Sequence, residues 1–198
     1  MRSLRLHMTA ALRKESIYST PEEYLCGERV SQTKHEYLAG MIYAMAGASR
    51  EHNQVARNIL AELTGHLRGK PCEPFGSDMR LRIRRVDHSF YYYPDVTVDC
   101  SGENVQEIEA PSVIFEVLSP DTERADRGDK LVNYQSLPSM RVYVLVDQYK
   151  TAVTVFRRGA GDAWAMEFLG DMAATLELPE IGCALPLAAI YERLPWVG

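Results

Sequence analysis

Long apolar runs are absent from this sequence, and their absence excludes one large class of proteins. No stretch approaches the roughly 20 consecutive apolar residues that a helix needs to cross a bilayer. The segment Met1–Lys14 also lacks the apolar core, about 7–15 residues long, of a secretory signal peptide. We therefore expect a cytoplasmic protein that has no membrane among its partners.

Cysteine is scarce, with four residues among 198, and the four lie far apart. No pair has the Cys-X-X-Cys spacing that is typical of zinc sites and redox motifs, so a structural zinc site is not expected. Disulfides are rare in a reducing cytoplasm. We therefore expect free thiols at Cys26, Cys72, Cys100 and Cys183.

Positive charge is also limited, because 22 Lys and Arg stand against 27 Asp and Glu, for a net charge of −5. This balance argues against a strong general affinity for nucleic acid. One stretch is nevertheless rich in positive charge, because Arg80, Arg82 and Arg84 alternate with Leu81 and Ile83. The alternation places the arginines on one face of a strand. That face is either a solvated sheet surface or a surface that follows phosphates.

The content of apolar residues is sufficient for one core. A chain of 198 residues with 46% hydrophobic and 25% charged residues suits one globular domain better than two. Neither repeats nor low-complexity linkers divide it. We expect residues 1–19 to form an N-terminal extension and residues 20–198 to form a single domain.

The order of elements is that of an α/β protein, with a mixed central sheet flanked by helices. Thr20 can cap a helix that starts at Pro21, and Ser49 can cap a longer helix with an apolar stripe that ends near Leu67. The expected helices cover residues 20–25, 49–67 and 123–136, and the expected strands cover residues 36–38, 41–45, 78–84, 95–99, 112–118, 141–147, 152–157 and 164–169.

Two acidic residues lie in or beside strands that are otherwise apolar. Asp95 follows Pro94, and Glu116 lies inside the apolar run 113–118. Burying a carboxylate costs several kcal/mol unless a cation or a hydrogen bond compensates. A divalent metal ion shared by Asp95 and Glu116 would compensate both. The alternatives are that Asp95 simply begins a strand at a turn and that Glu116 is a structural acid.

Asp126, Lys130 and Tyr134 recur at i, i+4 and i+8, so on a helix they share one face. If this helix leaves the end of the Glu116 strand, a lysine joins two acids around one point. Two carboxylates can hold a hard cation, and an ammonium group can contact a phosphate or an attacking water. This set is typical of a metal-dependent phosphodiesterase. The alternative for Asp126 and Lys130 is an exposed helix pair worth a few tenths of a kcal/mol, and Tyr134 is expected to pack while shaping the site.

Together these residues resemble the Uma-type family of restriction endonucleases, a branch of the PD-(D/E)XK nuclease superfamily. The resemblance covers roughly residues 20–158 and implies a restriction-endonuclease-like fold with an αβββαβ core. The matching elements are Pro94-Asp95, Glu116-Val117-Leu118-Ser119-Pro120, Asp126, Lys130, Tyr134, the strand 142–147 that ends in Asp147, and upstream the segment 34–43 and His52.

The resemblance also implies roles for individual residues. The usual superfamily pattern would place the lysine at position 118, where this chain has Leu118, and in the Uma-type branch the lysine has moved to the following helix, which implies Lys130. Glu36 is expected as an additional acid near the metal, and His52 as a group that supports the ligands or faces the phosphate. From the residues alone, Glu36 could instead pair with Lys34 or Arg50, and His52 could be a capping or core histidine.

The expected chemistry is hydrolysis of phosphodiester bonds with Mg²⁺, for which Mn²⁺ can substitute. Asp95 and Glu116, with the backbone carbonyl of Val117, would hold the metal, and Lys130 would orient water or neutralise charge in the transition state. The expected substrate is double-stranded DNA, and the resemblance implies products with a 5′-phosphate and a 3′-hydroxyl. Cleavage of both strands is most easily achieved by a homodimer with two-fold symmetry.

Two other functions remain open from the sequence. The acidic net charge and the lack of an appended DNA-recognition domain are compatible with a nuclease-fold module that has lost catalysis and serves DNA binding or assembly. An RNA-processing nuclease on the same fold is the other alternative. Substrate tests and an Asp95→Ala variant distinguish these from a DNA endonuclease.

Overall fold

The computed structural model describes residues 18–103 and 106–197. Residues 1–17 of the expected N-terminal extension lie outside this range. Its last two residues, Tyr18 and Ser19, lie within it. The Ser19 amide donates to the Gly40 carbonyl at 2.8 Å, and the Tyr37 hydroxyl donates to the Ser19 carbonyl at 2.9 Å. In the described part of the chain, every helix is too short or too polar to cross a membrane.

Helices and strands follow one another as expected for an α/β protein. The helical segments are α1 (Pro21–Glu28), α2 (Arg50–Leu67), α3 (Glu123–Ala125), the π turn η1 (Asp126–Lys130), α4 (Leu131–Gln135), the 3₁₀ turns η2 (Ala160–Asp162) and η3 (Pro179–Ile181), and α5 (Leu187–Ile190). The strands are β1 (His35–Leu38), β2 (Met41–Ala44), β3 (Glu73–Gly76), β4 (Arg80–Arg84), β5 (Ser89–Tyr92), β6 (Val96–Asp99), β7 (Glu107–Ile108), β8 (Pro111–Leu118), β9 (Val142–Asp147), β10 (Val153–Arg158), β11 (Trp164–Leu169), β12 (Thr175–Leu178) and β13 (Cys183–Pro186).

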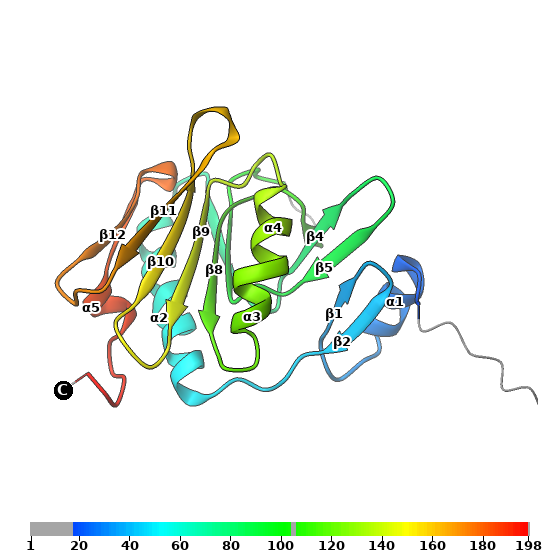
Figure 1. Cartoon of the computed structure of the whole chain (residues 1–198), viewed down its shortest axis with the longest axis horizontal. Coiled ribbons are helices and arrows are strands. Elements are labelled where there is room, and N and C mark those ends of the chain that lie inside the picture. The colour runs from blue at the N-terminus through cyan, green and yellow to red at the C-terminus, as the bar shows by residue number, and fades with distance from the viewer. Residues whose placement is uncertain (1–17, 104–105, 198) are drawn as a thin grey trace, which may run out of the picture.

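The central sheet has six strands in the order β11-β10-β9-β8-β6-β3 (Figure 1). β8 and β9 are parallel, and the other neighbours are antiparallel, so the expected mixed sheet is confirmed. The elements of this sheet keep the αβββαβ order: α2, then β3, β6 and β8, then the helical segment α3–α4 and β9. The expected strand 78–84 is not one of them, because β4 lies in a second sheet and β3, which was not expected, takes its place. A hairpin of β12 and β13 and the short α5 complete the side of the sheet that α2 covers.

Alternating residues of β8 face two different cores. Val113 and Val117 pack with the apolar stripe of α2, whereas Ile114 and Leu118 pack with side chains of α4, β4 and β5. Since successive side chains of a strand point to opposite faces, Glu116 shares the face of Ile114 and Leu118. Its carboxylate therefore points toward the helical segment that follows β8. The strands β4 and β5 of a second sheet lie on the same side.

That second sheet has five strands in the order β2-β1-β5-β4-β7. The hairpin of β1 and β2 and the strand β4 are expected from the sequence, but β5 is not. β5 pairs with β1 on one side and β4 on the other, so it joins them into one sheet. The consequence for function is that β1 lies near the helical segment that follows β8, where Glu36 contacts Lys130.

The arginine face of β4 is only partly solvated. Arg80 and Arg82 have side chains only 19% and 23% exposed, and both pair with Glu107. Arg84 is more exposed and contacts Glu109 at 2.6 Å. Carboxylates of the neighbouring segment already pair with these arginines, so the face is not open to phosphates, and it is solvated mainly at Arg84.

Cys72 and Cys100 form a disulfide, so the expectation of free thiols is wrong for this pair. β3 and β6 are antiparallel, with Glu73 opposite Asp99. This register brings the two flanking cysteines face to face. Their separation of 28 residues gives no signal in the sequence, because strand register is not visible there. The other two cysteines, Cys26 and Cys183, are free thiols as expected.

Candidate active site

Three carboxylates surround the buried ammonium group of Lys130. Its Nζ lies 3.0 Å from Oε1 of Glu116, 3.1 Å from Oδ1 of Asp126 and 3.3 Å from Oε1 of Glu36. These acids come from β8, from the π turn and from β1. Lys130 and Asp126 are only 7% and 1% exposed, so the reading of an exposed helix pair is wrong.

The π turn Asp126–Lys130 interrupts the regular helix that the sequence predicts over residues 123–136. Such turns are rare and occur frequently at functional sites. The expected common face is nevertheless present, because Lys130 and Tyr134 both reach the same atom. The Tyr134 hydroxyl donates to Oε1 of Glu116 at 2.8 Å, and the Lys130 ammonium donates to that oxygen at 3.0 Å. Tyr134 thus packs in the core and orients the carboxylate of Glu116.

Asp95 lies directly before β6 and is bonded to the strand that carries Glu116. Its Oδ2 accepts a hydrogen bond from the Val117 amide at 2.7 Å, and the same oxygen lies 3.2 Å from Nε2 of His52. His52 stands in the first turn of α2, where its amide donates to the capping hydroxyl of Ser49. His52 therefore contacts Asp95, as its expected supporting role requires, whereas Val117 was expected to offer its backbone carbonyl to the metal. The contact to Val117 uses its amide.

The two sets of residues share one electrostatic environment. Burial raises the pKa of Glu116 well above its usual range, and the Lys130 ammonium opposes this shift. Asp126, Asp95 and Glu36 raise the pKa of Glu116 further. Burial alone would lower the pKa of Lys130, but the surrounding carboxylates outweigh it and raise that pKa well above its usual range. Lys130 is therefore charged at neutral pH.

The pKa of His52 is also set by opposing effects. Burial lowers its pKa, but the hydrogen bond and the charge of Asp95 outweigh burial, so that the pKa of His52 is raised. The Val117 carbonyl and the charge of Asp126 add to the increase. His52 is buried and paired with Asp95, which agrees both with the expected supporting role and with the alternative of a core histidine that has its polar partner.

The donor set fits a magnesium ion. Four carboxylates, of Glu36, Asp95, Glu116 and Asp126, stand against one ammonium group, that of Lys130, which contacts three of them. Carboxylate oxygens are the ligands that Mg²⁺ prefers. In residues 18–103 and 106–197, no three His, Cys, Asp or Glu side chains form a ready cage for a metal ion. Mg²⁺ is commonly held by only one or two carboxylates with waters and substrate phosphates, and Asp95 and Glu116 suit that mode.

Tyr92 and Asn133 belong to this neighbourhood although the sequence did not point to them. The ring centroid of Tyr92 lies 5.8 Å from Nζ of Lys130, and its hydroxyl accepts a hydrogen bond of 2.6 Å from Asn133. The signal that could have found Tyr92 is the aromatic run 90–93, directly before Pro94-Asp95. It reads as β5, a short strand of aromatic residues.

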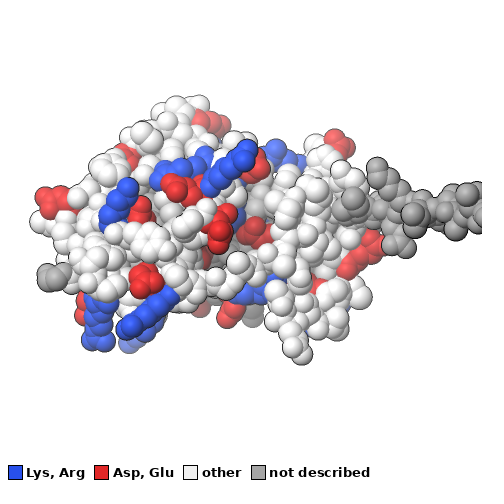
Figure 2. Space-filling model, turned by 60° about the horizontal axis from the view of Figure 1, so that its bottom comes forward, with Lys and Arg blue, Asp and Glu red and all other residues white. Residues whose placement is uncertain are grey.

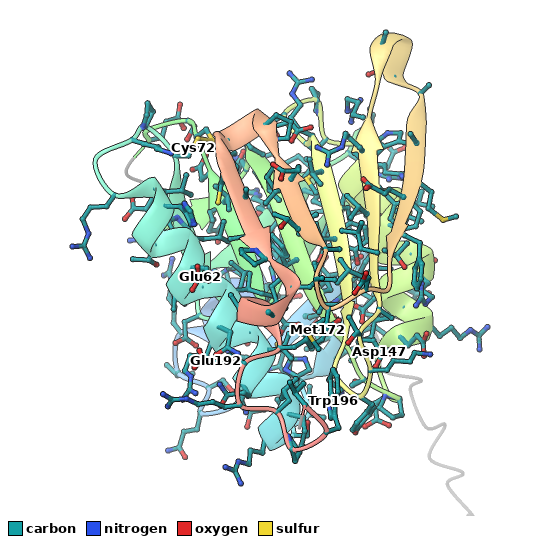
Figure 3. The ribbon with its side chains drawn as sticks, turned by 90° about the vertical axis from the view of Figure 1, so that its left-hand side faces the viewer. Glu62, Cys72, Asp147, Met172, Glu192 and Trp196 are labelled. Atoms are coloured by element: carbon teal, nitrogen blue, oxygen red, sulfur yellow. A yellow bond between two sulfur atoms is a disulfide. The ribbon has the colours of Figure 1, made fainter. Side chains whose placement is uncertain are left out.

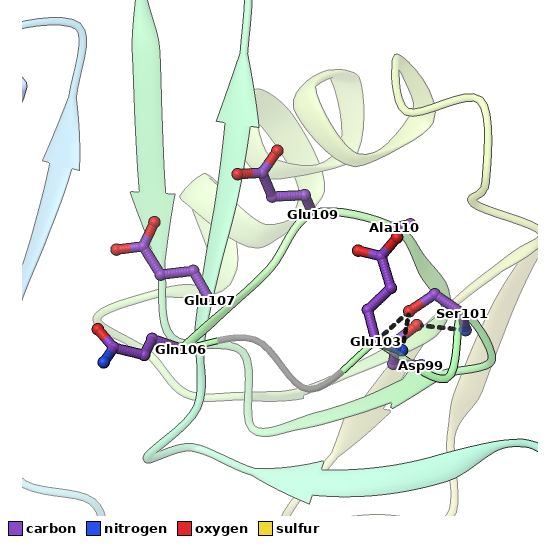
Figure 4. A pocket seen from close by; sticks show the side chains of 7 residues that line it. All are labelled: Asp99, Ser101, Glu103, Gln106, Glu107, Glu109 and Ala110. Carbon is purple, nitrogen blue, oxygen red and sulfur yellow. Dashed lines mark hydrogen bonds between the residues drawn. The ribbon is translucent and has the colours of Figure 1, made fainter.

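The N-terminus of α2 and the end of β8 lie at the lower edge of the molecule in Figure 1. Figure 2 turns this edge forward, and acidic and basic side chains of the described residues are interspersed over the visible face. A separate hollow of about 420 Å³ contains none of the predicted site residues (Figure 4). It is lined by Asp99, Ser101, Glu103, Gln106, Glu107, Glu109 and Ala110.

A mixed sheet in αβββαβ order, with a buried acid on its central strand β8 and a buried lysine in the helical segment that follows, defines a protein of the restriction-endonuclease-like class. The chain belongs to the Uma2 family, described as "Putative restriction endonuclease", which matches residues 21–188. The resemblance seen in the sequence is thereby confirmed.

Two relatives and one solved structure are consistent with this assignment. The chain is 35% identical to the uncharacterized protein slr1290 of Synechocystis sp. (strain PCC 6803), over 88% of this chain and 92% of that protein. It is 32% identical to the uncharacterized protein sll1609 of the same organism, over 78% of this chain and 89% of that protein. A crystal structure titled as "a putative nuclease belonging to DUF820" from Anabaena variabilis has a TM-score of 0.67 at 18% identity, covering 86% of this chain and 96% of that one. At 18% identity, this structural similarity is evidence for the fold alone.

Proposed function

We propose that this protein is a Mg²⁺-dependent endonuclease that hydrolyses phosphodiester bonds in double-stranded DNA. The observation that carries the proposal is the buried cluster in which Lys130 contacts Glu116, Asp126 and Glu36, with Asp95 bonded to the strand of Glu116. Membership of the Uma2 family supports nuclease chemistry for this cluster.

Each residue of the cluster has a defined task in this proposal. Asp95 and Glu116 would hold Mg²⁺, which when bound supplies Lewis acidity toward the phosphate and lowers the pKa of a bound water. Lys130 keeps its proton because its pKa is raised, so it can donate hydrogen bonds to the attacking water or to a phosphate oxygen. A fixed ammonium group in a site with little solvent stabilises the negative charge that develops in the transition state. Asp126 holds Lys130 in place.

His52 and Tyr134 fix the two metal-binding carboxylates in orientation. His52 contacts Oδ2 of Asp95, and Tyr134 donates to Oε1 of Glu116. Partners of this kind orient metal ligands and commonly change metal affinity or activity when they are removed. Glu36 adds negative charge beside Lys130 from the second sheet.

The visible face in Figure 2 carries interspersed acidic and basic side chains. A net charge of −5 repels the phosphate backbone, and the arginines of β4 are paired internally. Phosphate contacts dominate the affinity of most DNA-binding proteins. We therefore propose that DNA binding depends strongly on Mg²⁺ in the active site.

The test is cleavage of supercoiled plasmid with Mg²⁺ or Mn²⁺, with EDTA as the metal-free control. Glu116→Gln should abolish nicking, whereas Glu73→Gln, at an exposed position on β3 of the same sheet, should cleave like the wild type. The products should carry a 5′-phosphate and a 3′-hydroxyl. Cleavage by Glu116→Gln at the wild-type rate would contradict the proposal.

The same assay separates the two alternatives. Wild-type protein that binds DNA without cutting it, and whose affinity survives Asp95→Ala, would be a binding or assembly module. Cleavage of structured RNA in preference to DNA would indicate an RNA-processing nuclease.

A further inference from the structure

A closed ring of contacts lies beside the proposed active site, and one buried glutamine closes it. Gln148 directly follows β9 and is 1% exposed. Its Nε2 donates to the Leu118 carbonyl at 2.7 Å, and its Oε1 accepts from the Ser49 hydroxyl at 2.5 Å. A carbonyl can only accept a hydrogen bond, so the amide NH₂ must face Leu118. Both ends of the amide are used, and Gln148 is fixed in one orientation.

The remaining links lead from Ser49 back to β8. The Ser49 hydroxyl oxygen accepts from the His52 amide at 3.1 Å, and Nε2 of His52 lies 3.2 Å from Oδ2 of Asp95. That oxygen accepts from the Val117 amide at 2.7 Å. Val117 and Leu118 are neighbours on β8, so the ring is complete. It joins the end of β9, the start of α2, the residue before β6 and the end of β8.

We propose that Gln148 is a positioning residue for Asp95. Through Ser49 and His52 it sets where the first turn of α2 stands relative to β8, and thereby fixes the Asp95 carboxylate beside the strand of Glu116. Hydrogen bonds are directional and weaken steeply when bent, so a ring of them permits one arrangement. The inference rests on the proposed function, because the position of Asp95 matters for metal binding and cleavage.

The C-terminal segment provides a matched control. Nε1 of Trp196 donates to the backbone carbonyl of Gln148 at 2.9 Å, and Figure 3 shows Trp196 beside the end of β9 that is marked by Asp147. This contact attaches the tail to the same residue without using the side-chain amide. Trp196→Phe therefore removes a hydrogen bond to Gln148 and leaves the ring intact.

The first test is the kinetics of plasmid cleavage with Mg²⁺. Gln148→Met keeps the length of the side chain and removes both of its hydrogen bonds. We expect kcat to fall between about tenfold and a hundredfold, the scale of a misplacement near 1 Å, with KM unchanged. Ser49→Ala should lower kcat similarly, and Ser49→Thr, which retains the hydroxyl, should restore most of it. The double variant should be no worse than the poorer single variant, since either change opens the ring.

Trp196→Phe should lower the melting temperature and leave kcat unchanged. Wild-type kcat in Gln148→Met would overturn the inference while the proposed function stands. Losses that multiply in the double variant would overturn it as well, because Gln148 and Ser49 would then act independently.

A second test needs neither metal nor DNA. Amide hydrogen exchange in the metal-free protein should be faster at His52 and Val117 in Gln148→Met than in the wild type, with amides of β10, such as Val155, as the reference. Equal exchange would overturn the inference. Faster exchange in a protein whose wild type does not cut DNA would uphold the ring and reject the proposed nuclease activity.

Discussion

The ammonium group of Lys130 is the main counter-charge for a set of carboxylates that folding removes from water. Glu116 and Asp126 are 3% and 1% exposed, and each lies within 3.1 Å of Nζ of Lys130. Replacing one partner of such a buried pair is strongly destabilising, because it leaves an uncompensated charge, at a cost of about 3–5 kcal/mol. The stability of the metal-free protein should therefore depend strongly on the balance of charge in this cluster.

This balance leads to a prediction about metal binding. At a hundredfold excess over Kd, Mn²⁺ should stabilise the wild type by about 2.7 kcal/mol through mass action on the folded state, or ~5–10 °C for a chain of this size. Glu116→Gln keeps the shape of the side chain, removes its charge and should lose this gain. Thermal unfolding with and without Mn²⁺ measures both. An equal gain in the two proteins would remove Glu116 from the ligand set.

Lys130→Met tests the residue whose assignment departs most from the superfamily pattern. The variant keeps the aliphatic stem and removes the ammonium, so Glu116, Asp126 and Glu36 lose their counter-charge. We expect a lower melting temperature without metal, a larger gain from Mn²⁺ than in the wild type, and cleavage slower by about 10²-fold or more, the range for loss of a preorganised electrostatic group.

The control for this change is Lys150→Met, since the Lys150 side chain is 73% exposed and its nearest ion-pair contact is 3.8 Å. It should change neither unfolding nor cleavage. Asp126→Asn should slow cleavage less than Lys130→Met, because Asp126 acts by holding Lys130. If Lys130→Met cuts plasmid at the wild-type rate, Lys130 is not the source of the catalytic charge, and the role implied by the family resemblance fails at this position.

At the scale of elements, the disulfide joins two strands at the opposite end of the sheet from Trp196, as the label of Cys72 shows in Figure 3. Closing a loop of this length restricts the unfolded chain, and the entropic model gives about 3–4 kcal/mol for a separation of 28 residues. We predict that the double variant Cys72→Ser/Cys100→Ser loses stability of that order. Urea unfolding with and without a reducing agent measures it, and a variant as stable as the oxidised wild type would contradict the prediction.

The elements also show what the sequence could and could not reveal. The apolar stripe of α2 and the buried strands β8 and β9 carry strong periodic patterns, and most of the central sheet was predicted from such patterns, although its edge strand β3 was not. β5 has only four residues, which is too short for a clear period, and its pairing with β1 and β4 is a long-range property. The prediction that Glu36 lies near the site came from family resemblance alone, since the pairing through β5, which brings β1 near the π turn, is not visible in the sequence.

At the scale of the whole molecule, one chain presents one cluster of proposed catalytic residues, whereas a DNA duplex has two strands to cut. Two copies related by a two-fold axis would place a site at each strand, and this is the commonest symmetry of oligomers. We predict a homodimer, with a mass in light scattering of about twice the 22.4 kDa of the chain. A monomeric mass at micromolar concentration, with linear DNA produced in one binding event, would contradict it.

The distribution of tyrosines leads to a prediction about alkaline stability. Eight of the eleven tyrosines are buried, and burial is the first cause of a raised pKa in each of them. An unfolded chain releases its phenol protons near pH 10, while the folded protein retains them. Below about pH 10 both states keep these protons, so the free energy of unfolding does not depend on them. Above that pH only the unfolded chain releases them, so the free energy of unfolding falls as the pH rises.

We therefore expect most of the phenolate absorbance to appear together with loss of the folded circular-dichroism signal, in one cooperative step above about pH 10. Tyr134 and Tyr143, which pack edge to face in the core behind Glu116, should ionise only in that step. The reference is the same titration in denaturant, where all the phenols ionise without a step. Full phenolate absorbance while the folded signal persists would show that the buried tyrosines ionise within the folded state, and that their burial does not link alkaline pH to unfolding.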